Sequence, residues 1–470
     1  MLFAAANLLV AGQVLDIGSR LEPFVDHFLI DRLEGTTLKL HEPQPAGVVL
    51  KFDQPWEGIH CGYVTVIKDG EVYRLYYRGL PKSGRDGSED EVTCYAESQD
   101  GIKWRKPNLA LFEVSGTREN NVILHGFAPA SHNFCPFLDT RAGVPSTERF
   151  KAVGGTQASG LIAFVSADGI RWKKLREEPI FTKGAFDSQN GAFWSESEGC
   201  YVLYFRTWTG GEYRGFRTVS RTTSKDFVNW TDPVEMDFGA TPREHLYTSQ
   251  THPYFRAPHL YVATPMRFVP GRQVLSEAQA RALGVAKDYF GDCADAGFMT
   301  SRGGHRFDRT FMEGWIRPGT DLGNWASRAG MTALGIVPTG PAELSVYKQA
   351  HYAQPSAHLV RYTLRTDGFA SVHAPYAGGE MVTKPLRFAG KELMINFATS
   401  AAGSVRVEIQ DEAGKAIAGF ALADAREQVG DDIERVVSWK AGSDLSVCAG
   451  RVVRLRVVMK DADLYALRFR

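Results

Sequence analysis

The sequence has no excess of either charge, because it holds 54 Lys and Arg against 54 Asp and Glu in 470 residues. A chain without net charge lacks the electrostatic attraction that draws proteins to nucleic acid or to anionic membranes. It also contains no run of about 18 apolar residues, the length that a membrane-spanning helix needs. We therefore expect neither nucleic acid nor a membrane as a partner.

Cysteine is scarce, and its spacing excludes two common uses. No pair of cysteines has the separation of metal ligands, and the set is too dispersed for a dense disulfide framework. We expect buried free thiols, since cysteine packs as a small hydrophobic residue. The six stand singly, as Cys61, Cys94, Cys135, Cys200, Cys293 and Cys448.

The apolar beginning, "MLFAAANLLVAG", has no Lys or Arg before its apolar run and therefore makes a poor signal peptide. The sequence does not decide between a cytoplasmic, periplasmic or secreted location, and it gives no oligomeric state. Hydrophobic residues make up 44% of the chain and charged residues 23%, which is ordinary globular usage. The length allows two or three domains.

A turn phrase built from Ser, Asp, Gly and Trp recurs along the chain. It reads "SQDGIKW" at Ser98–Trp104, "SADGIRW" at Ser166–Trp172 and "SKDFVNW" at Ser224–Trp230, and worn copies begin at Ser301 and Arg365. We expect the Asp to cap the backbone of a tight turn and the Gly to adopt a positive φ. The Trp is expected to cover an outer hydrophobic edge.

The five turns follow one another at intervals of 58 to 77 residues. Two alternating runs divided by "KDG" and a third run precede the first turn, so each repeat predicts four strands. Four-stranded units in radial repetition are propeller blades. We predict an all-β protein, with a five-bladed β-propeller over residues 55–375 that carries any catalytic site. Residues 1–54 are expected to form a strand segment that packs on the propeller, and residues 376–470 a jelly-roll-like β-sandwich.

Polar residues stand where the inner strands of several repeats begin, although structural needs alone predict small or apolar residues there. In a propeller these positions converge on one funnel, and Arg78, Arg206 and Arg267 end the strands that follow. We therefore predict a substrate pocket there. Its expected binding residues are His132, Asn133, Gln189, Asn190, Arg206, Tyr247, Gln250, His252, Trp325 and Arg328.

Glu244 and Asp187 are the two carboxylates predicted to carry chemistry. Two carboxylates that flank a glycosidic bond suffice for its hydrolysis, one protonating the leaving oxygen and the other acting as base, nucleophile or stabiliser. We expect Glu244 to be the general acid and Asp187 to stabilise the sugar, with Asp26 as a third catalytic candidate. The structural alternatives are an ion pair between Glu244 and Arg243, and turn-capping roles for the two aspartates.

The propeller pattern resembles glycoside hydrolase families 32, 43 and 68, which include invertase, arabinanase and levansucrase-like enzymes. The phrases "FVDHFLID", "GAFDSQN" and "LYTSQTHPYFRAPHLYV" more closely resemble a bacterial glycosyl hydrolase family 32-like group. The resemblance implies three carboxylates, with Glu244 matching the acid and Asp187 the stabiliser. The first inner strand, "HCGYVTVIKD", has no Asp at its start, so Asp26 is the substitute for the base, and fructan hydrolysis is not expected.

Three functions stay open at this point. The first is an exo-acting glycoside hydrolase that releases a terminal, anionic or neutral sugar from an oligo- or polysaccharide, which long loops such as "VPGRQVLSEAQARALGVAKDYFGDCAD" favour. The second is a polysaccharide lyase that acts on a uronate through a Tyr or His base and an Arg. The third is a carbohydrate-binding propeller without catalysis. We expect no cofactor; axial Ca²⁺ held by His132 or Gln250 is conceivable, but no motif supports it.

Overall fold

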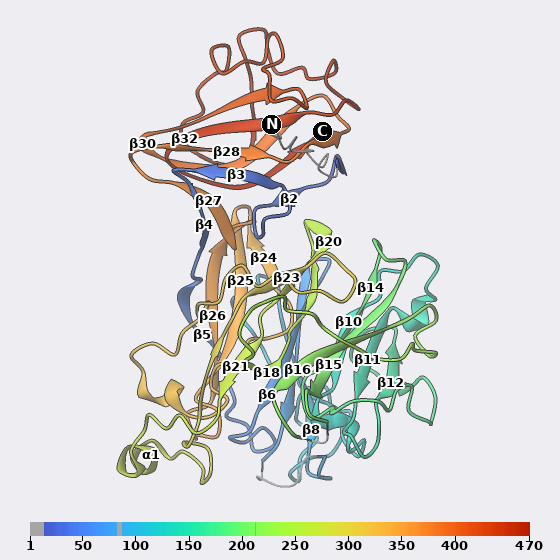
Figure 1. Ribbon diagram of the computed structural model, residues 1–470. Helices are drawn as coiled ribbons and strands as arrows, with labels where there is room; N and C mark the ends of the chain where they lie inside the picture. The colour runs from blue at the N-terminus through green and yellow to red at the C-terminus, as the bar shows by residue number, and fades with distance from the viewer. Residues whose placement is uncertain (1–13, 82–86, 212) are drawn as a thin grey trace, which may run out of the picture. The chain divides into compact units, whose positions relative to one another are not determined.

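The computed structural model describes residues 14–81, 87–211 and 213–470, which are nearly all in β-structure and turns (Figure 1). The chain divides into two compact units. The larger is Glu42–Arg365, and the smaller joins the chain up to His41 with Thr366–Arg470. The predicted N-terminal segment, residues 1–54, is thus shared between the two units. Its apolar start, residues 1–13, lies outside the described residues.

Three antiparallel sheets of the larger unit each hold four strands in chain order. In each, alternating residues face a core that is rich in Tyr and Phe, as the period-two pattern predicts. The sheets are β6 (Gly62–Asp69), β7 (Val72–Gly79), β8 (Val92–Ser98) and β9 (Val122–Leu124); β10 (Cys135–Leu138), β11 (Phe150–Gly154), β12 (Ile162–Ser166) and β13 (Lys173–Lys174); and β14 (Gly191–Ser195), β15 (Cys200–Trp208), β16 (Arg217–Ser224) and β17 (Val234–Glu235).

The fourth repeat is split into two three-stranded sheets rather than one sheet of four strands. Gln250 has a left-handed φ of 52° and divides the first strand, while Pro265, which cannot donate to a ladder, divides the second. The two sheets are β18 (His245–Thr248), β21 (Met266–Val269) and β22 (Cys293–Ala296); and β19 (His252–Tyr254), β20 (Ala257–Ala263) and β23 (Met299–Ser301).

The fifth sheet takes its outer strand from the beginning of the chain. It runs β24 (Val337–Gly340), β25 (Glu343–Ala350), β26 (His358–Arg365) and β5 (Gln44–Lys51). The predicted propeller range, residues 55–375, took "FASVHAP" as this outer strand. This was wrong, because β27 (Ala370–Ala374) pairs instead with two strands of the smaller unit. The inner strands of successive sheets contact one another: β6 with β10, β10 with β14, β14 with β19, and β24 with β6.

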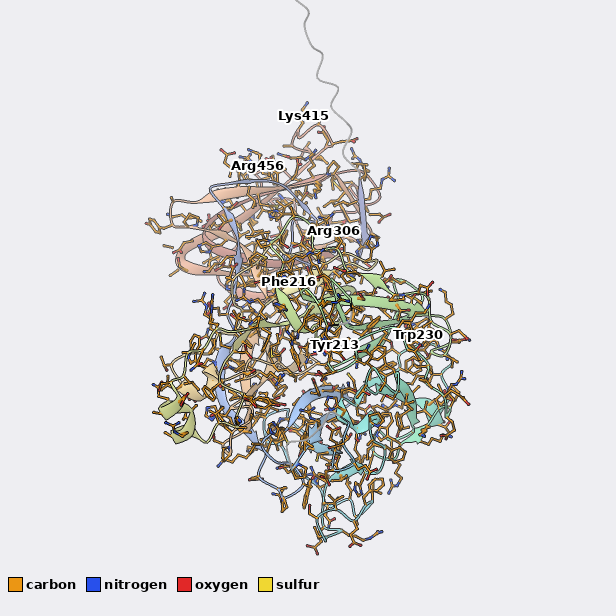
Figure 2. All side chains as sticks on the ribbon, turned by 60° about the horizontal axis from the view of Figure 1, so that its bottom comes forward. Tyr213, Phe216, Trp230, Arg306, Lys415 and Arg456 are labelled. Carbon is orange, nitrogen blue, oxygen red and sulfur yellow. The ribbon has the colours of Figure 1, made fainter. Side chains whose placement is uncertain are left out.

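The three clear copies of the recurring turn form as predicted. In the first, Asp100 accepts hydrogen bonds from the backbone N–H groups of Ile102 and Lys103, both at 2.8 Å, and Gly101 has a φ of 70°. The second and third copies repeat this pattern, and in the third Phe227 holds the left-handed position that Gly holds elsewhere. Trp230 lies at the edge of the larger unit in Figure 2. The fourth strand of the first sheet, however, is β9, and the stretch after the first turn meets β8 through an isolated bridge from Glu97 to Arg105.

The smaller unit is built on two long antiparallel strands, β30 (Leu393–Gln410) and β32 (Arg454–Phe469), which pair over most of their length. Buried Trp439 and the stacked rings of Phe388 and Phe469, 3.7 Å apart, lie in its core. A parallel pair joins β1 (Leu15–Gly18) to β29 (Leu386–Phe388). The other strands are β2 (Glu22–Pro23), β3 (Ile30–Glu34), β4 (Thr37–Leu40), β28 (Gly379–Thr383) and β31 (Asp431–Val436).

Helices are few and short. The long loop after β21 contains α1 (Glu277–Leu283), where Ser276 and Gln279 form a capping box (Figure 1). Three single turns of 3-10 helix are η1 (Ala130–His132), η2 (Ser146–Glu148) and η3 (Leu322–Trp325). In the described part of the chain no helix is long and apolar enough to cross a membrane. All six cysteines are buried free thiols, as predicted.

Candidate functional site

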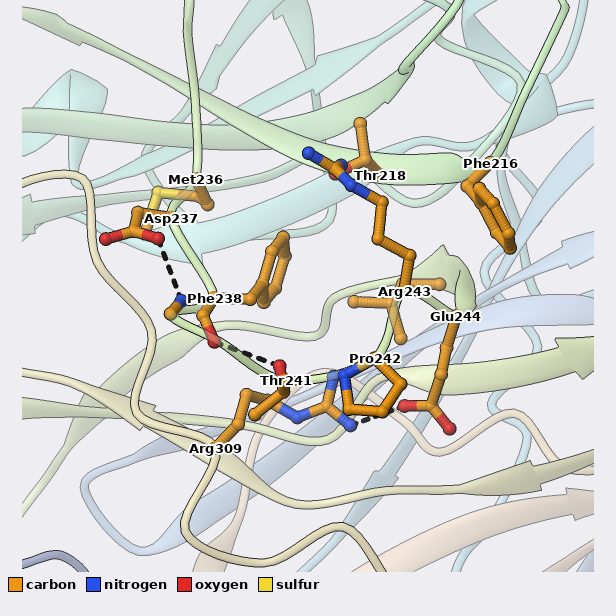
Figure 3. Close-up of a pocket in the computed structure, with 12 residues that line it drawn as sticks. Phe216, Thr218, Met236, Asp237, Phe238, Thr241, Pro242, Arg243, Glu244 and Arg309 are labelled. Atoms are coloured by element: carbon orange, nitrogen blue, oxygen red, sulfur yellow. Dashed lines mark hydrogen bonds and ion pairs between the residues drawn. The ribbon is translucent and has the colours of Figure 1, made fainter.

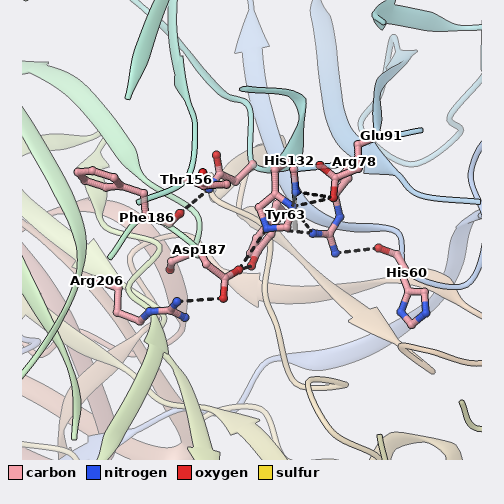
Figure 4. A network of polar contacts seen from close by, with 12 residues as sticks. His60, Tyr63, Arg78, Glu91, His132, Thr156, Phe186, Asp187 and Arg206 are labelled. Carbon is pink, nitrogen blue, oxygen red and sulfur yellow. Dashed lines mark hydrogen bonds and ion pairs between the residues drawn. The ribbon is translucent and has the colours of Figure 1, made fainter. Parts of the chain in front are cut away.

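Asp187 lies where side chains from two sheets of the larger unit and from η1 meet (Figure 4). Its carboxylate is 3.1 Å from His132 Nε2, 3.1 Å from Arg206 and 3.2 Å from the hydroxyl of Tyr63. Burial alone would raise the pKa of Asp187, but the hydrogen bonds and positive charges of His132 and Arg206 lower it well below its usual range. Because 26% of the side chain remains exposed, Asp187 is an ionised carboxylate within reach of a ligand.

His132 is held between two carboxylates. Its Nδ1 is 2.8 Å from Glu91, which comes from the loop between β7 and β8, and its Nε2 faces Asp187. Burial and the charge of Arg78 oppose an imidazolium, yet the bonds to Asp187 and Glu91 raise the pKa of His132 above its usual value. His132 thus fixes the orientation of Asp187 and stays protonated at a higher pH than a free histidine.

Tyr63 and Arg78 form the side of this cluster that belongs to the first sheet. The guanidinium of Arg78 lies 4.8 Å from the ring centre of Tyr63, and it donates to the carbonyl of His60 at 2.9 Å and to the Tyr352 hydroxyl at 3.0 Å. Burial and the charge of Asp187 raise the pKa of Tyr63 well above its usual value. Tyr63 is therefore a neutral phenol that donates to Asp187.

Tyr247 is surrounded by positive charge. Its ring centre is 4.9 Å from the guanidinium of Arg206, 5.5 Å from that of Arg217 and 5.3 Å from that of Arg328. The hydroxyl of Ser188, next to Asp187, donates to the Tyr247 carbonyl at 2.8 Å and ties the third sheet to the fourth repeat. The quadrupole of an aromatic ring attracts cations to its face. The Tyr247 ring therefore stabilises three guanidinium groups that would otherwise repel one another.

His60 and Tyr289 extend the cluster beyond Arg328. Tyr289 comes from the long loop after β21, and its ring centre is 5.0 Å from the guanidinium of Arg328 and 5.1 Å from the ring of His60. Burial and the charges of Arg78 and Arg328 lower the pKa of His60 to about 4, so its imidazole is neutral near pH 7. Its buried Nε2 has no hydrogen-bond partner among the described residues.

Five of the predicted binding residues are occupied by contacts within the protein. Gln250 donates to Gln189 at 2.7 Å and to the Thr332 carbonyl at 2.6 Å. His252 accepts from the N–H of Ile336 at 3.1 Å, and burial lowers its pKa to about 4. Asn133 and Asn190 likewise donate to backbone carbonyls, including that of Phe186. These side chains fasten the inner strands to one another.

Glu244 lies in a separate cavity of about 100 Å³, shown in Figure 3. Arg309 donates to its carboxylate at 2.6 Å and Arg267 at 3.3 Å, whereas Arg243 pairs with Glu235 at 2.8 Å. The structural alternative of a Glu244–Arg243 ion pair is therefore replaced by a pairing with two other arginines. Among the described residues, no hydrogen bond or ion pair joins Glu244 to Asp187.

Two further predicted residues make contacts within their own segments. Asp26 belongs to the smaller unit, where its carboxylate accepts from the Phe28 N–H at 2.9 Å. Trp325, at the end of η3, donates to the Gly319 carbonyl at 2.9 Å. The structure thus brings together Asp187, His132, Arg206, Tyr247 and Arg328 from the predicted set.

Sequence reasoning did not assign Tyr63, Glu91, Arg217 or Tyr289 to the site. Tyr63 stands in the first inner strand, near the point where the resemblance led us to look for an Asp, and a search for polar residues of any kind there would have found it. Tyr289 lies in the long loop quoted from the sequence, and Glu91 lies in the loop between β7 and β8. Arg217 begins a middle strand and carries no signal in the sequence.

Within the described ranges, no group of three or more His, Cys, Asp or Glu side chains is placed to hold a metal ion. The candidate site is instead rich in arginine and tyrosine. Four guanidinium groups, those of Arg78, Arg206, Arg217 and Arg328, share it with two carboxylates, those of Asp187 and Glu91.

Neither the known protein families nor the curated proteins contain a match to this chain. Among solved structures, a glycoside hydrolase is similar over 69% of this chain and 92% of its own, at 12% identity and a TM-score of 0.46. An N-acetylgalactosamine deacetylase from F. plautii, in complex with blood group B trisaccharide, is similar over 71% and 97%, at 12% identity and a TM-score of 0.43. A structure from the GH130 family of mannoside phosphorylases is similar over 74% and 96%, at 15% identity and a TM-score of 0.40. At such identities, similarity to a solved structure does not define an activity.

Proposed function

We propose that the larger unit is a five-bladed β-propeller enzyme that cleaves glycosidic bonds, with Asp187 at its reacting centre. The contacts between successive inner strands support the radial arrangement, and β5 would close the ring by completing the fifth blade. The observation that carries the enzymatic proposal is Asp187 itself. It is an ionised, partly exposed carboxylate held by side chains from β6, η1 and β15.

Hydrolysis of a glycoside passes through a transition state with positive charge at the sugar ring. A fixed negative charge stabilises that charge without reorganisation during the reaction. His132, Arg206 and Tyr63 hold Asp187 from three directions, so its orientation is set before a substrate binds. We assign Asp187 the role of stabilising the transition state, as the sequence suggested.

The proposed mechanism does not use Glu244 as the general acid. Arg267 and Arg309 engage its two oxygens, and an acid must instead present a proton to the leaving group. The proposal gives Asp26 no role either, because its carboxylate caps the backbone of its own segment through the Phe28 N–H. Long loops that contribute Glu91 and Tyr289 to the cluster support an exo-acting enzyme, whose pocket holds the end of a chain.

A second reaction, β-elimination from a uronate, is favoured by the surroundings of Tyr247. A lyase needs a base for the proton next to the carboxylate and cations for the negative charge that develops. Three guanidinium groups lie around the Tyr247 ring. The neutral imidazole of His60 contacts the Tyr289 ring, which in turn packs against the guanidinium of Arg328. This arrangement supplies both kinds of group.

The two reactions are separated by their products. The purified protein would be incubated with a panel of neutral and acidic oligosaccharides, and new reducing ends would be measured together with the ultraviolet absorbance of unsaturated sugars. New reducing ends without that absorbance support hydrolysis, and both signals together support elimination. Binding of an oligosaccharide without either signal, at high enzyme concentration and long incubation, would identify a binding protein and overturn the proposal.

A further inference from the structure

The proposed cleavage site contains two arginines whose charges are not balanced by an ion pair. Arg206 is paired with Asp187, and Arg78 lies beside Glu91 and Asp187. Arg217 and Arg328, in contrast, make no ion pair with a carboxylate among the described residues, although both lie near the Tyr247 ring. Two guanidinium groups that are close together and partly buried repel each other unless an anion lies between or beside them.

Aromatic stacking holds these two guanidinium groups in place. Arg217 lies 4.5 Å from the ring centre of Trp208 and 4.8 Å from that of Phe268, in addition to Tyr247. Arg328 lies between the rings of Tyr247 and Tyr289. A stacked guanidinium keeps its edge available for hydrogen bonds, and the buried Nε atoms of both arginines have no partner among the described residues.

The backbone at Arg328 is also strained. Its φ is 62°, in the left-handed region that a non-glycine residue seldom adopts. Such a conformation persists where the surrounding structure requires that side chain at that place. Burial and the like charge of Arg206 lower the pKa of Arg217, which is the response of a cation that lacks a counter-ion.

We infer that Arg217 and Arg328 bind an anionic substituent of the sugar, a carboxylate or a sulfate ester, beside Asp187. The inference rests on the proposed function, since it names the substrate class of the same site. Planar guanidinium groups match the paired oxygens of carboxylate and sulfate, and charge-assisted hydrogen bonds of this kind are the strong ones. The unpartnered Nε2 of neutral His60 supplies a hydrogen-bonding group for a sugar hydroxyl without adding charge.

The first test measures binding, which does not depend on turnover. Glucuronate, its methyl ester, glucose 6-sulfate and glucose are titrated into the full-length protein by calorimetry, together with Arg217→Gln, Arg328→Gln and the exposed control Arg171→Gln. We expect at least one anionic probe to bind more tightly than glucose. Each site variant should weaken that binding about 10- to 100-fold, the loss typical of a hydrogen bond to a charged group. Arg171→Gln should bind as the unmodified protein does.

The four probes distinguish a carboxylate from a sulfate, and comparing binding with cleavage distinguishes this inference from the proposed function. Preference for glucuronate over its methyl ester identifies a carboxylate, and preference for the sulfate identifies a sulfated sugar. Equal affinity for all four probes, no binding of any probe, or anionic preference that survives in both variants would overturn the inference. Anion-dependent binding without cleavage of any oligosaccharide would retain this inference and reject the proposed function, whereas cleavage of neutral oligosaccharides alone would do the reverse.

Discussion

Replacing Asp187 tests the proposed reacting centre most directly, because stability and activity should respond by different amounts. In Asp187→Asn the side chain keeps its shape and can still accept hydrogen bonds, but it loses its charge beside His132 and Arg206. Arg206 is only 3% exposed and has no other ion pair among the described residues. We expect unfolding to become easier by about 2 kcal/mol, the scale of one charge-assisted hydrogen bond.

Activity should fall far more steeply than stability. If Asp187 stabilises charge in the transition state, its loss should lower kcat by about 10²- to 10⁴-fold, the range seen for single groups that act in this way. Thermal unfolding followed by circular dichroism would report the folded fraction, and initial rates on the best oligosaccharide of the panel would report kcat. Because the folded fraction at 25 °C should stay near one, the rate loss cannot come from unfolding.

Asp168→Asn is the matched control. Asp168 is also an ionised aspartate of the larger unit, with a pKa lowered below its usual value chiefly by backbone hydrogen bonds from Arg171 and Ile170 against the effect of burial, but it caps one of the recurring turns. We expect it to lose at most about 1 kcal/mol, since its ion pair with Arg171 is exposed, and to keep its full kcat. Equal losses of activity in Asp187→Asn and Asp168→Asn, or a normal kcat in Asp187→Asn, would refute the assignment.

Three other changes follow from the structure. Glu244→Gln should lower thermal stability, by about 1–3 kcal/mol because Arg267 and Arg309 lose their anion, and change kcat less than 10-fold; a loss of about 10² or more would make Glu244 the general acid after all. The pKa of His252 is about 4 in the folded protein, against 6.5 for an unperturbed histidine, which represents the unfolded chain. Between pH 6.5 and 4 the unfolded chain therefore binds more protons, and the free energy of unfolding should fall as the pH drops through this range. At about 1.4 kcal/mol per pKa unit, this fall amounts to about 3 kcal/mol. The free energy of unfolding of His252→Gln should depend less on pH over this range, and an identical dependence would contradict the prediction. Ser276→Ala should cost about 1 kcal/mol of local helix stability, seen as faster amide exchange within Glu277–Leu283 and nowhere else.

The recurring turns were predictable because their chemistry is local. Ser98, Asp100 and Gly101 are adjacent in the sequence, and all of their characteristic hydrogen bonds lie within a few residues. The fifth sheet could not be predicted in the same way. Its outer strand, β5, pairs with β26 across more than 300 residues, and the competing candidate at Ala370–Ala374 has an equally good strand pattern. Long-range pairing of this kind leaves no trace in a local pattern.

The candidate site, too, could be predicted from the sequence only in part. Asp187 and His132 could be proposed because polar residues at the start of an inner strand are out of place by structural rules alone. The same rule also selected Gln189 and Gln250, whose polarity serves contacts between inner strands. Whether a polar side chain faces a neighbour or a ligand depends on which partners the fold brings to it. That information lies in residues far away in the sequence.

Backbone strain occurs at both kinds of position, and what compensates for it differs between them. Tyr63, Gln250 and Arg328 have φ values of 51°, 52° and 62°, and none of them is glycine. Each such residue costs about 1–3 kcal/mol, and a glycine would remove most of that cost. Gln250 recovers it through two short hydrogen bonds within the protein. Tyr63 donates to Asp187, but Arg328 makes no such bond within the described structure, and only its stacked rings hold it. On the inference above, a bound anion would offset part of the strain at Arg328. Arg328→Gly should therefore make the free protein more stable than Arg328→Ala does, while both changes should weaken anion binding about 10- to 100-fold. If Arg328→Gly bound the anionic probe as well as the unmodified protein does, the strain would have no connection with ligand binding.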